Sequence, residues 1–153
     1  MFTADIPQIL RIEKAVQVSP WTEETFRVCF HAGYLGWLIE VDKIIVGYVI
    51  VAYAADECHI LNVCVDHAFQ RQGLGEKLLE YVLNQATQRG TMVAWLEVRR
   101  SNSRAISFYQ KMHFQQIGER KGYYPTVSGQ EDALIFAKQL SGSNPLSAQT
   151  ILG

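Results

Sequence analysis

Apolar residues recur along this chain with two different periods, and these periods predict its helices and strands. Residues 6–16, IPQILRIEKAV, carry apolar side chains at helical spacing. Residues 21–30 follow Ser19-Pro20, a pair typical of a helix N-cap and first helical position. We therefore expect two short helices at the start of the fold.

Three segments rich in β-branched and aromatic residues come next. Residues 34–41 and 44–54 are separated by Asp42-Lys43, which predicts an antiparallel hairpin. Residues 58–66, CHILNVCVD, predict a third strand.

The second half of the chain alternates between the two periods. From Gly73 to Arg89 the apolar residues fall on one helical face, and Gly90 is a typical stop signal. These apolar residues are Leu74, Leu78, Leu79, Val82, Leu83 and Ala86. Residues 92–98 then predict a strand, 103–112 a helix, and 114–124 and 132–140 two final strands. This order indicates the α/β fold class, and within it an α+β arrangement in which helices lie on the faces of a mixed sheet.

Composition limits the number of domains. The 153 residues are 48% hydrophobic and 19% charged, which fits one globular domain with a substantial core. We assign that domain to residues 1–140. Residues 141–153, SGSNPLSAQTILG, show no pattern that would anchor them, so we expect a flexible C-terminal tail.

Charge and hydropathy exclude several classes of partner. The net charge of -1 gives no basic surface for nucleic acid or anionic lipid. No apolar run approaches the roughly 20 residues of a membrane span, and the N-terminus lacks the pattern of a signal peptide. We therefore expect a cytoplasmic protein that binds neither nucleic acid nor membrane, with a monomer favoured.

The cysteines suggest neither a disulfide framework nor a metal site. Cys29, Cys58 and Cys64 are odd in number and show no C-x-x-C spacing, so we expect buried free thiols. Cys58 and His59 are adjacent in a predicted strand and should point to opposite faces. We expect no metal cofactor.

The segment Gln70-x-x-Gly73-x-Gly75 lies between the third strand and the long helix. Amides at a helix start lack intrahelical partners, and glycine lets an anion approach them closely. A phosphate or pyrophosphate suits such a place, with Arg71 adding positive charge. A glycine-containing turn with no ligand is the alternative. A dinucleotide fingerprint would need glycine at Leu78, and the Gly-Lys-Ser/Thr of a P-loop is missing.

This loop resembles the pyrophosphate loop of the GCN5-related N-acetyltransferase superfamily, which holds coenzyme A. Residues 95–114, WLEVRRSNSRAISFYQKMHF, and 122–136, GYYPTVSGQEDALIF, resemble segments of its RimI-type ribosomal-protein-alanine N-acetyltransferases. The resemblance runs from about Ile9 to Leu140. It implies the fold of that superfamily, a central mostly antiparallel sheet flanked by helices. The family's first strand must be short or absent here, because only Met1 to Ala4 precede the first helix.

Two positions depart from the family pattern. His113 stands where the family usually has glycine, and histidine tolerates a left-handed conformation better than most residues. Glu76 places a carboxylate beside the expected phosphate site, although an acidic residue suits the first turn of a helix.

The resemblance implies transfer of the acetyl group of acetyl-CoA to an amine. By resemblance the substrate is the N-terminal alanine of small-subunit ribosomal protein eighteen, Glu97 is the general base and Tyr109 the general acid. Glu97 interrupts an apolar strand, where a buried carboxylate is costly; an ion pair with Arg99 or Arg100 is the alternative. For Tyr109 the alternative is a tyrosine whose ring packs in the core.

The same resemblance implies which residues bind the substrates. Residues assigned to acetyl-CoA are Val63, Cys64, Val65, Arg71, Gln72, Gly73, Leu74, Gly75, Glu76 and Asn102. Asn102 has a respectable alternative as the N-cap of the following helix. Tyr123 and Tyr124 would help to form the wall where a peptide N-terminus enters, and a hairpin turn with aromatic packing is the alternative there.

Two other functions remain open. A CoA-binding regulatory module would keep the loop without catalysis, but Glu97 and Tyr109 argue against it. An acetyltransferase acting on a small amine, such as an antibiotic or a polyamine, would share the loop, because both bind the same cofactor. The tyrosines at 123 and 124 favour a peptide.

Overall fold

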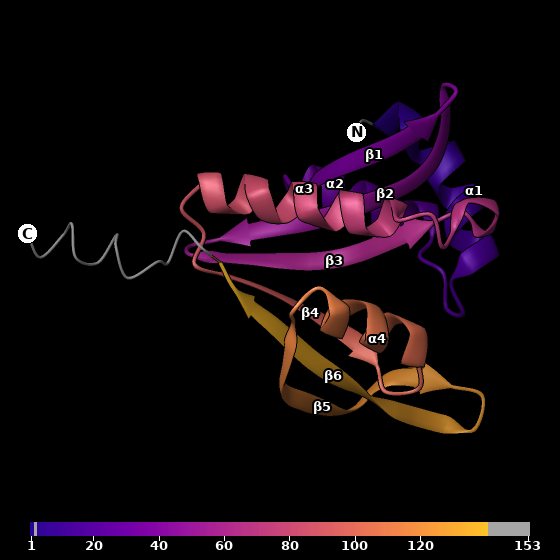
Figure 1. The fold of residues 1–153 in the computed structure, drawn as a ribbon. Coiled ribbons are helices and arrows are strands. Elements are labelled where there is room, and N and C mark those ends of the chain that lie inside the picture. The colour runs from indigo at the N-terminus through magenta and orange to yellow at the C-terminus, as the bar shows by residue number, and fades with distance from the viewer. Residues whose placement is uncertain (2, 141–153) are drawn as a thin grey trace, which may run out of the picture. The chain divides into compact units, whose positions relative to one another are not determined.

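A computed structural model describes residues 1 and 3–140 of the chain (Figure 1). In chain order its elements are η1 (Thr3–Asp5), α1 (Ile6–Val16), α2 (Glu23–His31), β1 (Leu35–Val41), β2 (Ile44–Ala54), β3 (Glu57–Val65), η2 (His67–Phe69), α3 (Leu74–Gln88), β4 (Val93–Arg99), α4 (Ser103–Lys111), β5 (Gln115–Thr126) and β6 (Gly129–Gln139). The strands form one sheet in the order β1-β2-β3-β4-β6-β5. The pairs β1–β2, β4–β6 and β5–β6 are antiparallel. The expected mostly antiparallel sheet with helices is confirmed, and the expected tail lies outside the described residues.

The described chain divides into two compact units. The first contains Met1–Tyr53 and Ile60–Gln85, and therefore β1, β2, most of β3 and helices α1 to α3. The second begins with Ala54–His59 and resumes at Ala86, and it contains β4, β5, β6 and α4.

In the first unit, helices cover both faces of β2. Tyr48 packs with residues of α1 and α2 in one buried cluster. Gly47 faces the other way, because a Cβ placed on it would lie 3.3 Å from Leu78 Cδ1 of α3. Figure 1 shows α3 running along these strands. Burial on both faces explains why β2 reads as a continuous apolar run.

A carboxylate is buried inside that first cluster. Glu13 of α1 is 1% exposed. Its Oε1 accepts hydrogen bonds from the Tyr48 hydroxyl and, at 3.0 Å, from the Asn62 amide, and its Oε2 accepts the Trp21 backbone N–H at 2.8 Å. One side chain thus connects α1 with β2, β3 and the segment before α2. Such a group is stable in the interior only while its hydrogen bonds are made.

In the second unit, β6 lies between β4 and β5. Alternate residues of β4 are buried, and Leu96 pairs with Phe136 of β6 in the register of the two strands. Helix α4 connects β4 to β5, and Tyr109 packs edge-on against Phe114 with ring centroids 5.8 Å apart.

Several local expectations are confirmed. Asp42 and Lys43 have positive φ angles of 51° and 65°, as a tight hairpin turn requires. His113 follows α4 with φ 69°, so histidine does take the left-handed conformation there. Among residues 1 and 3–140, no strand precedes α1; the segment Thr3–Asp5 is a 3-10 turn.

The expected start of the second helix is wrong. Helix α2 begins at Glu23, and Thr22 caps it by accepting the Thr25 N–H at 3.2 Å, whereas Ser19 and Pro20 lie before the helix. The Trp21 N–H is bound to Glu13, which holds the chain away from helical geometry at that point. The expected strand 114–124 is observed as β5, which continues through Tyr123 and Tyr124 to Thr126. The alternative of a hairpin turn at these tyrosines is therefore wrong.

Candidate active site

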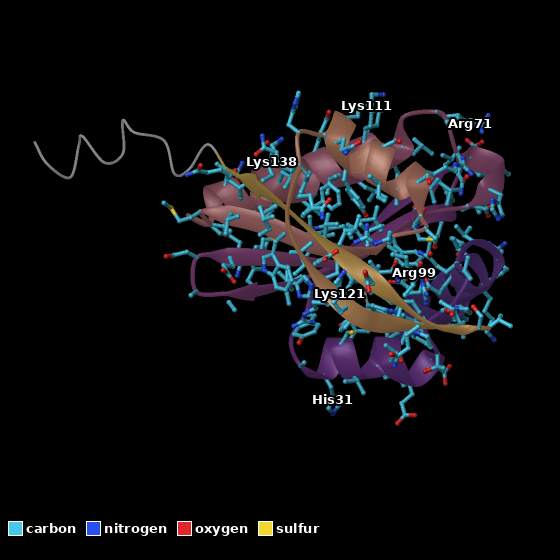
Figure 2. All side chains as sticks on the ribbon, turned by 90° about the horizontal axis from the view of Figure 1, so that it is seen from below. His31, Arg71, Arg99, Lys111, Lys121 and Lys138 are labelled. Atoms are coloured by element: carbon cyan, nitrogen blue, oxygen red, sulfur yellow. The ribbon has the colours of Figure 1, made fainter. Side chains whose placement is uncertain are left out.

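The loop of the first unit enters α3 through two left-handed residues. Arg71 has φ 63° and Gly73 has φ 78°. Gln70 fixes the loop to the preceding strand, because its Nε2 donates to the Val65 carbonyl at 2.9 Å. Arg71 is exposed, and Figure 2 shows it on the outer side of the loop. Gly73 therefore has a conformational role, and the side chain of Arg71 is exposed to solvent.

The start of α3 has the geometry of an anion site. The Lys77 N–H donates to Gly73 O at 3.1 Å, so the helical ladder begins there and the amides of Leu74, Gly75 and Glu76 precede it. These amides lie at the positive end of the helix dipole, where a phosphate is stabilised. Glu76 occupies the first turn and is half-buried. The residues predicted to hold a pyrophosphate thus form one continuous loop and helix start.

The last three residues of the strand before the loop carry no reactive nucleophile. Val63 and Val65 are half-buried and Cys64 is buried. Burial raises the pKa of the Cys64 thiol to about 12, so the thiolate is not formed at neutral pH. What this strand can offer a ligand is its backbone.

In the second unit, Glu97 contacts an arginine and a histidine. Its side chain is 9% exposed, Oε2 lies 2.9 Å from Arg120 Nη1 of β5, and Oε1 lies 3.3 Å from His59 Nε2 of β3. The alternative that Glu97 pairs with Arg99 or Arg100 is wrong. Arg99 pairs with Glu131 at 3.1 Å, and Arg100 pairs with Glu119 and Asp132.

The two tyrosines of β5 each lie beside an arginine. The guanidinium of Arg120 lies 5.0 Å from the ring centre of Tyr123, and that of Arg99 lies 4.4 Å from the ring centre of Tyr124. Burial, together with the negative charge of Glu97, raises the pKa of Tyr124 to about 12. Tyr124 therefore keeps its proton at neutral pH. The structure thus brings Glu97 and Tyr123 together at Arg120, and Tyr124 packs beside Tyr123 and Arg99.

Asn102 and Tyr109 lie at the start and near the end of α4. The Asn102 side chain accepts the Ala105 N–H at 3.1 Å, which makes it the N-cap of the helix, as the alternative reading predicted. Tyr109 is half-buried, and its ring contacts Phe108 and Phe114. Packing of the ring and a role for its hydroxyl are compatible, since the two involve different atoms.

Sequence reasoning missed the partners of Glu97. His59 stacks on Trp95 with ring centroids 3.7 Å apart, and Arg120 reaches Glu97 from another strand. The one indication in the sequence was the alternation of residues in β4. It places Trp95, on which His59 stacks, on the same face as Glu97. The buried Glu13 was also missed, although it falls on the apolar face of α1, following Ile6 and Ile9 at helical spacing.

Neither a metal site nor a membrane span is found in the described part of the chain. Residues 1 and 3–140 contain no group of three His, Cys, Asp or Glu side chains placed to hold a metal ion. None of the helices among these residues combines the length and the hydropathy needed to cross a membrane.

Comparison with known proteins identifies clear relatives. The acetyltransferase (GNAT) family matches residues 6–114. The ribosomal protein bS18-alanine N-acetyltransferase of Escherichia coli strain K12 is 37% identical over 139 residues, which are 91% of this chain and 94% of that protein. Its counterpart in Salmonella typhimurium is 38% identical over 139 residues, again 91% of this chain and 94% of the relative.

A solved structure agrees with these sequence matches. The crystal structure of the ribosomal-protein-S18-alanine N-acetyltransferase from Escherichia coli has a TM-score of 0.85 and 36% identity, covering 92% of this chain and 90% of that one. The resemblance to the RimI-type enzymes is thereby confirmed.

Proposed function

Because the chain belongs to the acetyltransferase (GNAT) family and is therefore an acyltransferase, we propose that it acetylates the N-terminal α-amine of a protein. The proposed substrate is the N-terminal alanine of ribosomal protein bS18, after which its relatives are named, and the proposed location is the cytoplasm. One observation carries the proposal: the bS18-alanine N-acetyltransferase of Escherichia coli is 37% identical to this chain over 91% of its length.

The donor in this proposal is acetyl-CoA, which supplies the acetyl group as a thioester. The amides at the start of α3 would hold its pyrophosphate, and Arg71 would add charge at the rim. Backbone groups of Val63 to Val65 would bind the pantetheine arm in the manner of strand addition. The Asn102 side-chain oxygen is engaged in the helix cap, so its amide group is the part left for the arm.

Proton transfer falls to residues of the second unit. An ammonium has no lone pair, so a proton must leave the amine before it attacks the thioester. Glu97 is proposed as the general base, since its side chain is 9% exposed and its carboxylate is directed at polar partners. Tyr109 is proposed to protonate the leaving thiolate, because a phenol and a thiol have comparable basicity.

The choice of an α-amine follows from its acidity. Its reference pKa is about 7.7 to 8.0, against about 10.4 for lysine, so far more of it is unprotonated at neutral pH. Tyr123 and Tyr124 would form a wall that admits a chain end with a small first side chain. A lysine within a protein has backbone on both sides of it, and this backbone would also have to fit at the entrance.

Kinetics on short peptides test this function. A peptide beginning with alanine should be acetylated once, and a bulky first residue should lower kcat/KM. Acetylation of polyamines without any reaction of peptides would favour the small-amine alternative. Binding of acetyl-CoA without turnover on any amine would favour the regulatory module.

A substitution in the loop tests the cofactor assignment. Gly75→Val places a branched side chain where an anion must approach the start of α3. We expect the Kd for acetyl-CoA to rise about tenfold or more, because one or two hydrogen bonds to a charged group are lost. Calorimetry measures the change.

Gly118→Val is the matched control. A Cβ at Gly118 in β5 would meet only Ile135 Cδ1, at 3.9 Å, so this variant should keep its affinity. A folded Gly75→Val protein with unchanged affinity for acetyl-CoA would contradict the loop assignment.

A further inference from the structure

His59 lies beside the proposed base, and no role in the reaction was predicted for it. Its imidazole stacks on the indole of Trp95 with ring centroids 3.7 Å apart and an interplanar angle of 6°. In this orientation Nε2 lies 3.3 Å from Glu97 Oε1. Stacking restricts the plane of the ring, so the edge that carries Nε2 stays directed at the carboxylate.

The position of the hydrogen on His59 follows from this contact. A carboxylate only accepts hydrogen bonds, so Nε2 must carry the hydrogen that faces Glu97. A neutral imidazole with its hydrogen on Nε2 has its lone pair on Nδ1. His59 can therefore accept a further proton at Nδ1 and keep its bond to Glu97.

Three charged side chains act on this imidazole. Burial lowers the pKa of His59, and the positive charge of Arg120 lowers it too, whereas the negative charges of Glu97 and Glu57 raise it. Burial is the largest of these effects and the pKa lies below the ordinary histidine value. His59 is thus neutral at neutral pH and available as a base.

The other oxygen of Glu97 is already engaged. Arg120 Nη1 lies 2.9 Å from Oε2, so a proton placed on Glu97 would weaken an ion pair. An imidazole is also intrinsically the stronger base, with reference pKa values of about 6.5 for histidine and 4.3 for glutamate in model peptides. Both facts favour Nδ1 of His59 as the final position of the proton.

We propose that His59 and Glu97 act as one proton-accepting pair, in which the proton from the substrate ammonium comes to rest on Nδ1 of His59. The Glu97 carboxylate orients the ring and stabilises the imidazolium by an ion pair. This inference rests on the proposed function and deepens it, because it names the atom that holds the proton.

The protons balance as follows. The substrate ammonium gives one proton to Nδ1, and the freed lone pair forms the C–N bond to the acetyl carbon as the C–S bond breaks. The nitrogen loses a second proton to water when the amide forms, and the departing thiolate gains a proton from Tyr109. Tyr109 recovers its proton through solvent, and His59 releases its proton to water. The products are the amide, the thiol and one free proton.

A double-mutant cycle tests whether the two residues act as one unit. His59→Gln and Glu97→Gln should each lower kcat by about 10²-fold. The double variant should be no slower than Glu97→Gln alone, because losses within one unit do not multiply. Losses that multiply would overturn the proposal, as would full activity of His59→Gln.

His31→Gln makes the same chemical change at an exposed position. His31 ends α2 in the first unit, and Figure 2 shows it on the outer side of that helix. We expect its kcat to match that of the unmodified protein. Thermal melting of all four variants establishes that they are folded.

The pH profile distinguishes a chemical role from a structural one. In the unmodified protein, kcat/KM should fall as pH drops through the pKa of His59, below about 6.5. In His59→Gln this acidic limb should shift to lower pH or disappear. An identical limb in both proteins would overturn the proposal.

A measurement without turnover separates this inference from the proposed function. Nuclear magnetic resonance can follow the His59 imidazole during titration of the unmodified protein and of Glu97→Gln. Loss of the negative charge should lower the pKa of His59 further, and an unchanged value would show that the two groups are not paired. If no peptide is acetylated, the proposed function fails, and this titration still decides whether the pair exists.

Discussion

Replacing Glu97 by glutamine is expected to lower kcat by about 10²-fold or more, with little change in the affinity for acetyl-CoA. Glutamine keeps the shape of the side chain, but it neither accepts a proton nor carries the charge that faces His59 and Arg120. The effect should therefore fall on the chemical step. Steady-state kinetics on an alanine peptide, with calorimetry for acetyl-CoA, measures both quantities.

Glu119→Gln provides the control for this change. Glu119 is a carboxylate of β5 in the same unit, where it pairs with Arg100 and Lys121. It should keep nearly full kcat. Near-normal turnover by a folded Glu97→Gln protein would return Glu97 to a structural role in the sheet.

Replacing Glu13 by alanine is expected to cost about 3–5 kcal/mol of unfolding free energy. The change removes the acceptor for the Tyr48 hydroxyl, the Asn62 amide and the Trp21 N–H, and leaves these donors without it inside the first unit. A loss of this size should lower Tm by on the order of 10 °C. Denaturant titration and calorimetry measure the two values.

Gln8→Ala is the matched control on the same helix. Gln8 is exposed, so its removal should change the unfolding free energy by no more than about 0.5 kcal/mol. Equal stabilities of Glu13→Ala and Gln8→Ala would show that the hydrogen bonds of Glu13 contribute nothing net to the fold.

Periodicity was sufficient for most of the fold because most elements bury one face, while β2, which is buried on both, reads as a continuous apolar run. The helix from Gly73 and the hairpin around Asp42-Lys43 follow from local spacing and turn chemistry alone. The start of α2 did not follow, since the Trp21 N–H is captured by Glu13, a residue of the preceding helix. A contact with a side chain eight residues earlier in the chain decided that boundary, and the local pattern of caps and prolines does not show it.

The candidate site, like the fold, could be predicted from the sequence only in part. The loop from Arg71 to Glu76 is contiguous, so its glycines and the helix start could be read directly from the sequence. The surroundings of Glu97 come from different strands, because His59 lies on β3 and Arg120 on β5. Strand order and register bring them together, and spacing along the chain gives no indication of either.

The central claim is that this acyltransferase modifies a protein chain end, and mass spectrometry tests it most directly. Ribosomal protein bS18 with a free N-terminal alanine would be incubated with acetyl-CoA and the enzyme, beside the same protein with a blocked N-terminus. We predict one added acetyl group, placed by fragmentation spectra on the terminal nitrogen, and none on the blocked protein. Acetyl groups found mainly on internal lysines, and equally on the blocked protein, would contradict the account.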